Sequence, residues 1–122
     1  MKWIVRILQG LLVVMFFMTG FVKLAGDPVQ AEAFTEIYGY GIWFMYVVGV
    51  IEVIAAFGLL IGFWKKQFVV IFSALLILVM AGAVFTHLQA GQEIQVATLP
   101  FVLLLMAAVV FLGQRRLNGK AA

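Results

Sequence analysis

Four long apolar runs follow one another along the chain and are separated by short polar stretches. The runs cover about residues 3–22, 42–64, 68–87 and 96–113. A helix needs about 20 apolar residues to cross the hydrocarbon core of a bilayer, and each run has nearly that length. The pattern therefore predicts an all-α fold, a transmembrane four-helix bundle with antiparallel up-down neighbours that forms a single domain over residues 1–122.

The longest polar stretch, residues 27–41, lies between the first and second runs. Asp27 suits the N-cap of a helix and Pro28 suits its first position, and good helix formers follow them. We therefore expect a short surface helix on the outer side of the membrane that ends near Gly39. Four apolar side chains of this helix would face the membrane or the bundle: Val29, Ala33, Phe34 and Ile37.

The composition also favours a membrane protein. Hydrophobic residues make up 66% of the 122 residues and charged residues 11%. A soluble domain has about one-half apolar and one-quarter charged residues, so a soluble bundle would lack the polar surface that it needs. The chain has no cysteine and one histidine, which excludes disulfides, cysteine-ligated metal sites and a haem held by two histidines. We therefore expect no metal site and no covalently attached cofactor.

The basic residues indicate how the bundle is oriented. Seven of the eight lie on one side of the expected membrane: Lys2, Arg6, Lys65, Lys66, Arg115, Arg116 and Lys120. The other side receives the remaining lysine and four acidic residues: Lys23, Asp27, Glu32, Glu36 and Glu93. The positive-inside rule then predicts a multi-pass protein of a bacterial-type inner (plasma) membrane with both termini in the cytoplasm. Because the basic residues are scattered between apolar runs, the lipid bilayer is the expected partner and nucleic acid is not.

Two features of the runs leave alternatives open. Lys2 and Arg6, the apolar residues after them and the segment 31–33 also resemble a cleavable signal peptide, although the run is long for one. Gly58 and Gly62 form a GxxxG pattern. Such a pattern supports close helix packing either inside one bundle or between copies, so a homo-oligomer stays open.

Three ionisable residues fall inside the runs or at their ends: Lys23, Glu52 and His87. Such residues cost about 2.5 to 3.5 kcal/mol each on insertion scales, so they usually face the bundle interior and mark a site. Glu52 lies near the middle of the second run and shares a helical face with the small residues Gly49 and Ala56. It therefore points into the bundle, either as part of a site or as a hydrogen-bonding group that holds two helices together.

Lys23 and His87 occupy the outer ends of the first and third runs. Lys23 shares a helical face with Gln9 and Thr19, but both ionisable residues are also explained as interfacial side chains that reach the headgroups. Glu52 lies about 15 Å below the outer boundary at 1.5 Å per residue, so its contact with the other two depends on side-chain length and helix tilt. We take Thr19, Lys23, Glu52 and His87 as one candidate ligand-binding site and assign no catalytic residue.

Several short segments carry a resemblance to a known family. They are Gly20-Phe21-Val22-Lys23-Leu24, Gly49-Val50-Ile51-Glu52 with Gly58 and Gly62, Met80-Ala81-Gly82-Ala83 with His87, and Pro100 at the opening of the last run. In these segments the chain resembles the DoxX-like family of small four-helix integral membrane proteins, over nearly its whole length. The resemblance implies that Lys23, Glu52 and His87 stand at the characteristic polar positions of the family.

The resemblance also implies a range of functions. Proteins similar to this chain are associated with a thiosulfate:quinone oxidoreductase subunit, with membrane complexes that defend against oxidative stress, and with membrane-protein assembly. The leading hypothesis is a membrane subunit or anchor of a redox or oxidative-stress system, accessory to a quinone-linked oxidoreductase and bound to a redox partner protein. Its pocket for a quinone or a small anion would lie in the outer half of the bundle. A small proton-coupled transporter or channel and a non-catalytic assembly factor are the alternatives.

Overall fold

The regular elements in the described part of the chain are all helices. The computed structural model describes residues 2–91 and 94–121, so Glu93 lies outside the described residues. In chain order its elements are α1 (Lys2–Leu24), α2 (Pro28–Glu32), the π-helix η1 (Ala33–Ile37), α3 (Ile42–Ile61), α4 (Lys66–Gln89) and α5 (Ile94–Ala121). The four long helices are each long and apolar enough to cross a membrane. The predicted all-α fold with four spans and a short helix between the first two is therefore confirmed.

Several helix boundaries differ from the predicted runs, most of all at the end of α5, which continues to Ala121 and not to residue 113. Helix α3 ends at Ile61 and not at residue 64, because the Phe63 amide donates to the Leu60 carbonyl and the Gln9 side chain donates to the Leu59 carbonyl at 2.7 Å. Gln9 thus satisfies a carbonyl that the end of a helix leaves without an amide partner. Helix α5 begins at Ile94, so Pro100 lies inside it and does not open it as expected.

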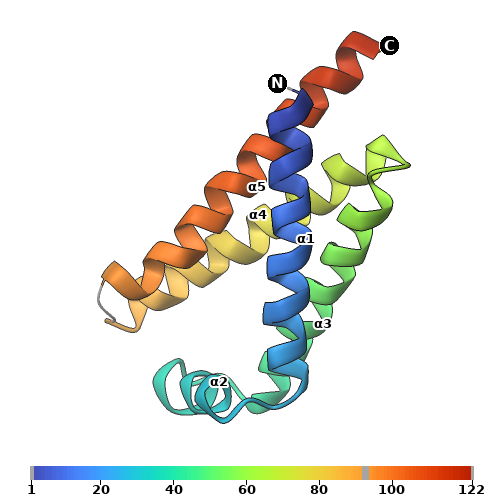
Figure 1. Ribbon diagram of the computed structural model, residues 1–122. Coiled ribbons are helices and arrows are strands. Elements are labelled where there is room, and N and C mark those ends of the chain that lie inside the picture. Colours follow the sequence, from blue (N-terminus) through green and yellow to red (C-terminus); the bar gives the residue numbers. More distant parts are fainter. Residues whose placement is uncertain (1, 92–93, 122) are drawn as a thin grey trace.

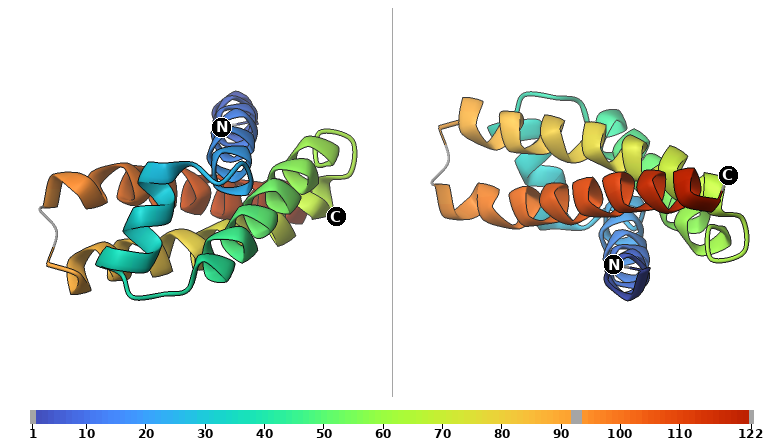
Figure 2. Two further views of the ribbon diagram at one scale, coloured as in Figure 1. Left: turned by 90° about the horizontal axis from the view of Figure 1, so that it is seen from below. Right: turned by 90° about the horizontal axis from the view of Figure 1, so that it is seen from above.

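The long helices form two antiparallel pairs, α1 with α3 and α4 with α5. The pairs meet at the end of the molecule that holds both termini and residues 62–65, here called the terminal end, and diverge toward the opposite end, here called the pocket end (Figure 1). Helices α2 and η1 lie across the opening at the pocket end (Figure 2). At the terminal end Arg6 of α1 donates a hydrogen bond to Gln114 of α5.

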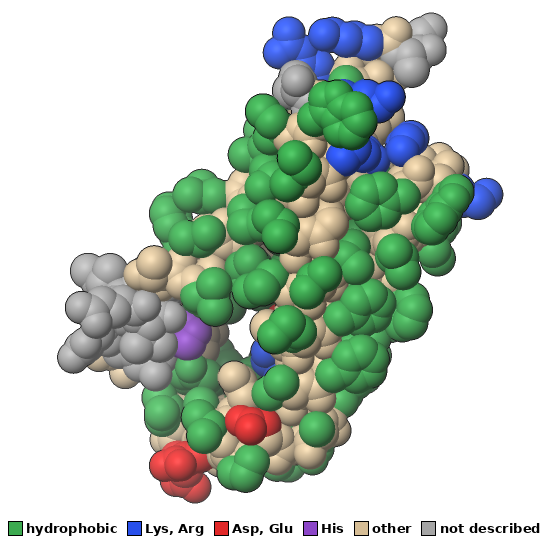
Figure 3. Space-filling view, in the orientation of Figure 1, with side chains coloured by type: hydrophobic (Ala, Val, Ile, Leu, Met, Phe, Trp, Pro, Cys, Tyr) green, Lys and Arg blue, Asp and Glu red, His purple; other side chains and the backbone are tan. Residues whose placement is uncertain are grey.

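The buried core lies between the helix pairs and is mostly aliphatic. The largest apolar side chains that are fully buried are Phe16, Leu12, Met45, Leu59 and Leu76. The outer faces are apolar as well, and hydrophobic side chains cover most of the surface in Figure 3. A surface of this kind is stable in contact with lipid chains and not with water. The molecule is therefore a multi-pass membrane protein.

Glycines allow the helices to approach closely at two places. A Cβ atom at Gly20 would lie 2.5 Å from Cγ2 of Val53 and 3.0 Å from the Gly49 carbonyl oxygen, so α1 and α3 touch backbone to backbone. In α3, a Cβ atom at Gly58 would lie 2.2 Å from the Phe72 ring of α4. The GxxxG pattern therefore packs inside the bundle at its first glycine, where a methyl group has no room.

We expect Gly20→Ala to destabilise the protein by roughly 1–3 kcal/mol, because the added methyl overpacks the contact between α1 and α3. The matched control is Gly82→Ala, since no atom of another element and no side chain beyond its chain neighbours lies within 4 Å of a Cβ atom at Gly82. That change stays within about 1 kcal/mol of the native protein, as expected for a helical glycine in open space. Thermal unfolding in detergent measures both variants, and equal stabilities would contradict the close approach.

Candidate functional site

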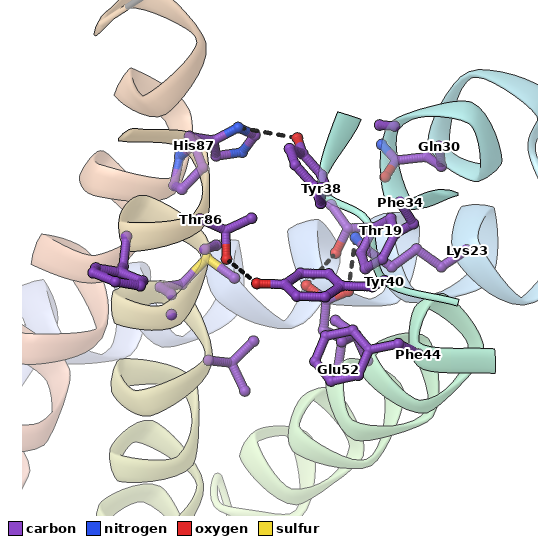
Figure 4. Close-up of a pocket in the computed structure, with 18 of the residues that line it drawn as sticks. Thr19, Lys23, Gln30, Phe34, Tyr38, Tyr40, Phe44, Glu52, Thr86 and His87 are labelled. Atoms are coloured by element: carbon purple, nitrogen blue, oxygen red, sulfur yellow. Dashed lines mark hydrogen bonds and ion pairs between the residues drawn. The ribbon is translucent and has the colours of Figure 1, made fainter. Parts of the chain in front are cut away.

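A cavity of about 870 Å³ lies at the pocket end, between the two helix pairs and beneath α2 and η1. Figure 3 shows the hollow from one side, and Figure 4 shows the side chains that line it. The polar and aromatic lining residues are Thr19, Lys23, Gln30, Glu32, Phe34, Tyr38, Tyr40, Phe44, Glu52, Phe85, Thr86 and His87. The volume lies in the range of about 300–1,000 Å³ that is typical of small-molecule sites.

An ion pair forms the floor of this pocket. Lys23 Nζ lies 2.9 Å from Glu52 Oε1, with side-chain exposures of 12% and 2%. The Thr19 hydroxyl lies 3.4 Å from Glu52 Oε2 and donates to it. The structure thus brings three of the four predicted site residues into contact. Lys23 turns inward to a carboxylate and does not extend to the headgroups, so its side chain fits a buried pair better than an interfacial anchor.

The close approach of α1 and α3 explains how Lys23 reaches Glu52. A Cβ atom at Gly49 would lie 3.0 Å from the Lys23 Cβ atom, and Glu52 follows Gly49 by about one helical turn. Helix α3 begins at Ile42, so its first two turns extend beyond the end of α1. The depth of about 15 Å estimated from the sequence for Glu52 assumed that α3 starts at the level where α1 ends. Because α3 starts further out, Glu52 lies at a depth that Lys23 can reach.

His87 lines the same pocket from α4, on a different wall from the ion pair (Figure 4). Its Nδ1 atom lies 3.1 Å from the Tyr38 hydroxyl, and the Tyr40 hydroxyl lies 3.1 Å from Thr86 Oγ1. These two hydrogen bonds join the segment that follows α2 to helix α4. They connect the two diverging helix pairs across the mouth of the pocket.

Aromatic rings form much of the remaining wall. Phe34 is buried with 8% of its surface exposed, and its ring centroid lies 5.6 Å from that of Tyr38 and 6.2 Å from that of Phe44. The Tyr40 and Phe44 centroids are 4.7 Å apart. Sequence reasoning missed both tyrosines as pocket residues, because aromatic residues near the end of a span are typical of the membrane interface. The high density of aromatic residues between residues 34 and 44 was the sequence signal that could have indicated an aromatic pocket wall.

The pocket therefore combines apolar walls with a few hydrogen-bonding groups. Lys23 carries three N–H donors, and Tyr38, Tyr40 and Thr86 carry hydroxyl groups that donate or accept. The charges of Lys23 and Glu52 balance each other. Within residues 2–91 and 94–121 there is no group of three or more His, Cys, Asp or Glu side chains that would hold a metal ion. The arrangement suits a flat, apolar, uncharged molecule with carbonyl or hydroxyl groups.

Comparison with known proteins gives two findings. The model of the DoxX-like family matches residues 7–110, a range that includes Thr19, Lys23, Glu52 and His87. The chain is also similar to "Uncharacterized protein YdgD" of Bacillus subtilis (strain 168), with 27% identity over 95 residues that cover 77% of this chain and 82% of that protein. No solved structure matches the chain.

The ion pair predicts strong coupling between its two partners. We expect Glu52→Leu to lower the free energy of unfolding by about 3 kcal/mol, because it leaves the Lys23 ammonium without its partner inside the bundle. The double variant Lys23→Leu/Glu52→Leu should lose at least about 1 kcal/mol less than the sum of the single variants. Glu36→Leu, which removes an exposed carboxylate, is the control. Additive losses in chemical unfolding would contradict this coupling.

Proposed function

The chain belongs to the DoxX-like family, and from this premise we propose that it is a membrane subunit or anchor of a redox or oxidative-stress system whose pocket binds a quinone headgroup. One observation carries the proposal. The only ion pair among residues 2–91 and 94–121 lies in the floor of an 870 Å³ apolar pocket that also contains His87. Convergence of a few polar groups in a large apolar pocket is the usual mark of a small-molecule site.

The walls of the pocket suit a ligand that arrives through the bilayer. Leu78, Phe85 and Leu99 line the pocket and are also 71%, 63% and 53% exposed on the outer surface. We infer from these exposures that the cavity opens toward the lipid-facing side of α4 and α5. A long apolar tail that lies along these side chains remains in contact with hydrocarbon while its headgroup reaches the polar floor.

The polar groups have distinct roles in this proposal. A bound quinone supplies two-electron, two-proton chemistry. Lys23 and the tyrosine hydroxyls donate hydrogen bonds toward carbonyl oxygens, and Glu52 fixes the Lys23 ammonium at 2.9 Å. His87, hydrogen-bonded to Tyr38 at 3.1 Å, fixes the position of that hydroxyl at the mouth of the pocket. Glu52 and His87 therefore position hydrogen-bonding groups on two sides of one pocket.

The ion pair favours an uncharged ligand over the other candidates. Because Glu52 already balances Lys23, a small anion meets no excess positive charge in the floor of the pocket. A cationic compound of the kind that proton-coupled exporters carry meets the Lys23 ammonium beside the carboxylate. A quinone, which is neutral and accepts hydrogen bonds, requires neither partner of the pair to separate.

The distribution of charge supports an orientation for the same protein. Basic side chains gather at the terminal end, and acidic side chains appear at the pocket end (Figure 3). We assign the terminal end to the cytoplasm and the pocket end to the outer side of a bacterial-type inner membrane, in accordance with the positive-inside rule. The quinone pocket then opens in the outer half of the bilayer.

The quinone proposal is tested by titrating the protein in nanodiscs with a short-chain quinone. We expect saturable binding to the native protein, and at least about tenfold weaker binding to Glu52→Gln and His87→Ala, since each change removes or misplaces a hydrogen bond worth about 1.4 kcal/mol in the dry pocket. Glu36→Gln is the matched control, because Glu36 lies outside the pocket lining.

Two results would count against the proposal. The quinone assignment is wrong if the folded native protein shows no saturable binding, or if Glu36→Gln weakens binding as much as Glu52→Gln does. The redox role has its own measurement, the ratio of reduced to oxidised quinone in membranes of the native host. We expect deletion of the protein to shift this ratio, and Glu52→Gln to fail to restore it.

The orientation is tested with single cysteines, because the chain has none of its own. Glu36→Cys and Lys65→Cys place one thiol at each end of the bundle, and both native side chains are exposed. We expect a membrane-impermeant maleimide to label Glu36→Cys in intact spheroplasts and Lys65→Cys only after permeabilisation. The reverse pattern would mean that the termini lie outside.

A further inference from the structure

A cluster of positive charge that the pocket does not use lies at the terminal end. The Arg6 guanidinium lies over the Phe63 ring, 6.0 Å from its centroid. Lys66 donates from Nζ to the Phe63 carbonyl at 2.8 Å. Lys2 stands four residues before Arg6 in α1, so the two side chains share one face of that helix. Arg6 and Lys66 therefore both contact Phe63 in the loop between α3 and α4, and Lys2 lies about one helical turn from Arg6.

No carboxylate of the described residues balances this cluster. Asp27, Glu32 and Glu36 all belong to the connection between α1 and α3 at the pocket end, and Glu52 is paired with Lys23. Arg6 donates to an uncharged amide, Gln114. Like charges that are held together without a counter-ion repel one another, and an anion that binds among them removes this repulsion.

The depth of the cluster indicates which anion is available. Trp3 and Trp64 flank it in sequence, and each has 76% of its surface exposed. Tryptophan side chains that are exposed at the ends of membrane helices lie at the level of the lipid headgroups. Arginine and lysine side chains at this level contact phosphate groups, which arginine can bind through two parallel hydrogen bonds.

We propose that Lys2, Arg6 and Lys66 form a binding site for the phosphate group of an anionic membrane lipid. The site binds the headgroup between α1 and α4, which come from the two different helix pairs. A bound lipid therefore links these pairs at the end where they converge. This site lies at the opposite end of the bundle from the quinone pocket and does not depend on it.

The test measures the binding of short-chain fluorescent phosphatidylglycerol to the protein in detergent by anisotropy. We expect the Lys2→Gln/Arg6→Gln/Lys66→Gln variant to bind at least about tenfold more weakly than the native protein, because it loses every phosphate contact of the site. The matched control, Arg115→Gln/Arg116→Gln/Lys120→Gln, removes the same charge from the end of α5 and should change binding by less than about threefold. If the triple variant does not fold, the test is repeated with Lys2→Gln/Lys66→Gln, which keeps the hydrogen bond between Arg6 and Gln114.

Competition identifies the source of the phosphate. Short-chain phosphatidylglycerol should displace the probe, whereas short-chain phosphatidylcholine and millimolar inorganic phosphate should not. Displacement by inorganic phosphate would replace the lipid assignment with a site for free phosphate. Equal losses in the cluster variant and in the α5 control would mean attraction by diffuse charge, and absence of binding to the native protein would overturn the site altogether.

Discussion

An ammonium and a carboxylate in contact inside an apolar bundle constrain everything around them. Neither Lys23 nor Glu52 is stable there alone, because a lone charge within a span costs several kcal/mol. The two reach a separation of 2.9 Å only because Gly20 and Gly49 let the backbones of α1 and α3 touch. The pair therefore fixes the register of α1 against α3. Any side chain larger than hydrogen at the crossing separates the charges as well as the helices.

The pocket follows from the way in which the second helix pair joins the first. At the terminal end, Gly58 accepts the Phe72 ring against its backbone, and Arg6 bonds to Gln114. These contacts hold the α4–α5 pair close to the α1–α3 pair at the terminal end, and the two pairs diverge toward the pocket end (Figure 1). The segment after α2 connects them again through Tyr38 and His87. A cavity with a polar floor and an aromatic mouth is the result.

Much of the fold could be predicted from the sequence, because the length of an apolar run and the bilayer thickness determine the spans. Helical periodicity also placed Thr19 and Lys23 on one inward face. The contact between Lys23 and Glu52 could not be derived, since it depends on how far α3 extends past the end of α1. The sequence did not mark Tyr38 as a pocket residue for a related reason. Residue type and depth are the same for an interfacial tyrosine and for one that reaches across a pocket, and only the tertiary arrangement separates them.

The two ends of the bundle use the same residue types to opposite effect. At the pocket end a lysine has a carboxylate at 2.9 Å, so the floor of the pocket is neutral, and in the proposed function it recognises a ligand by hydrogen bonds. At the terminal end Arg6 and Lys66 both contact Phe63. The partner of Arg6 is the uncharged amide of Gln114 and not a carboxylate, so the surface remains positive and attracts anions. The position of Glu52, and not the number of lysines and arginines, therefore decides which end of the molecule binds a neutral ligand and which binds a charged one.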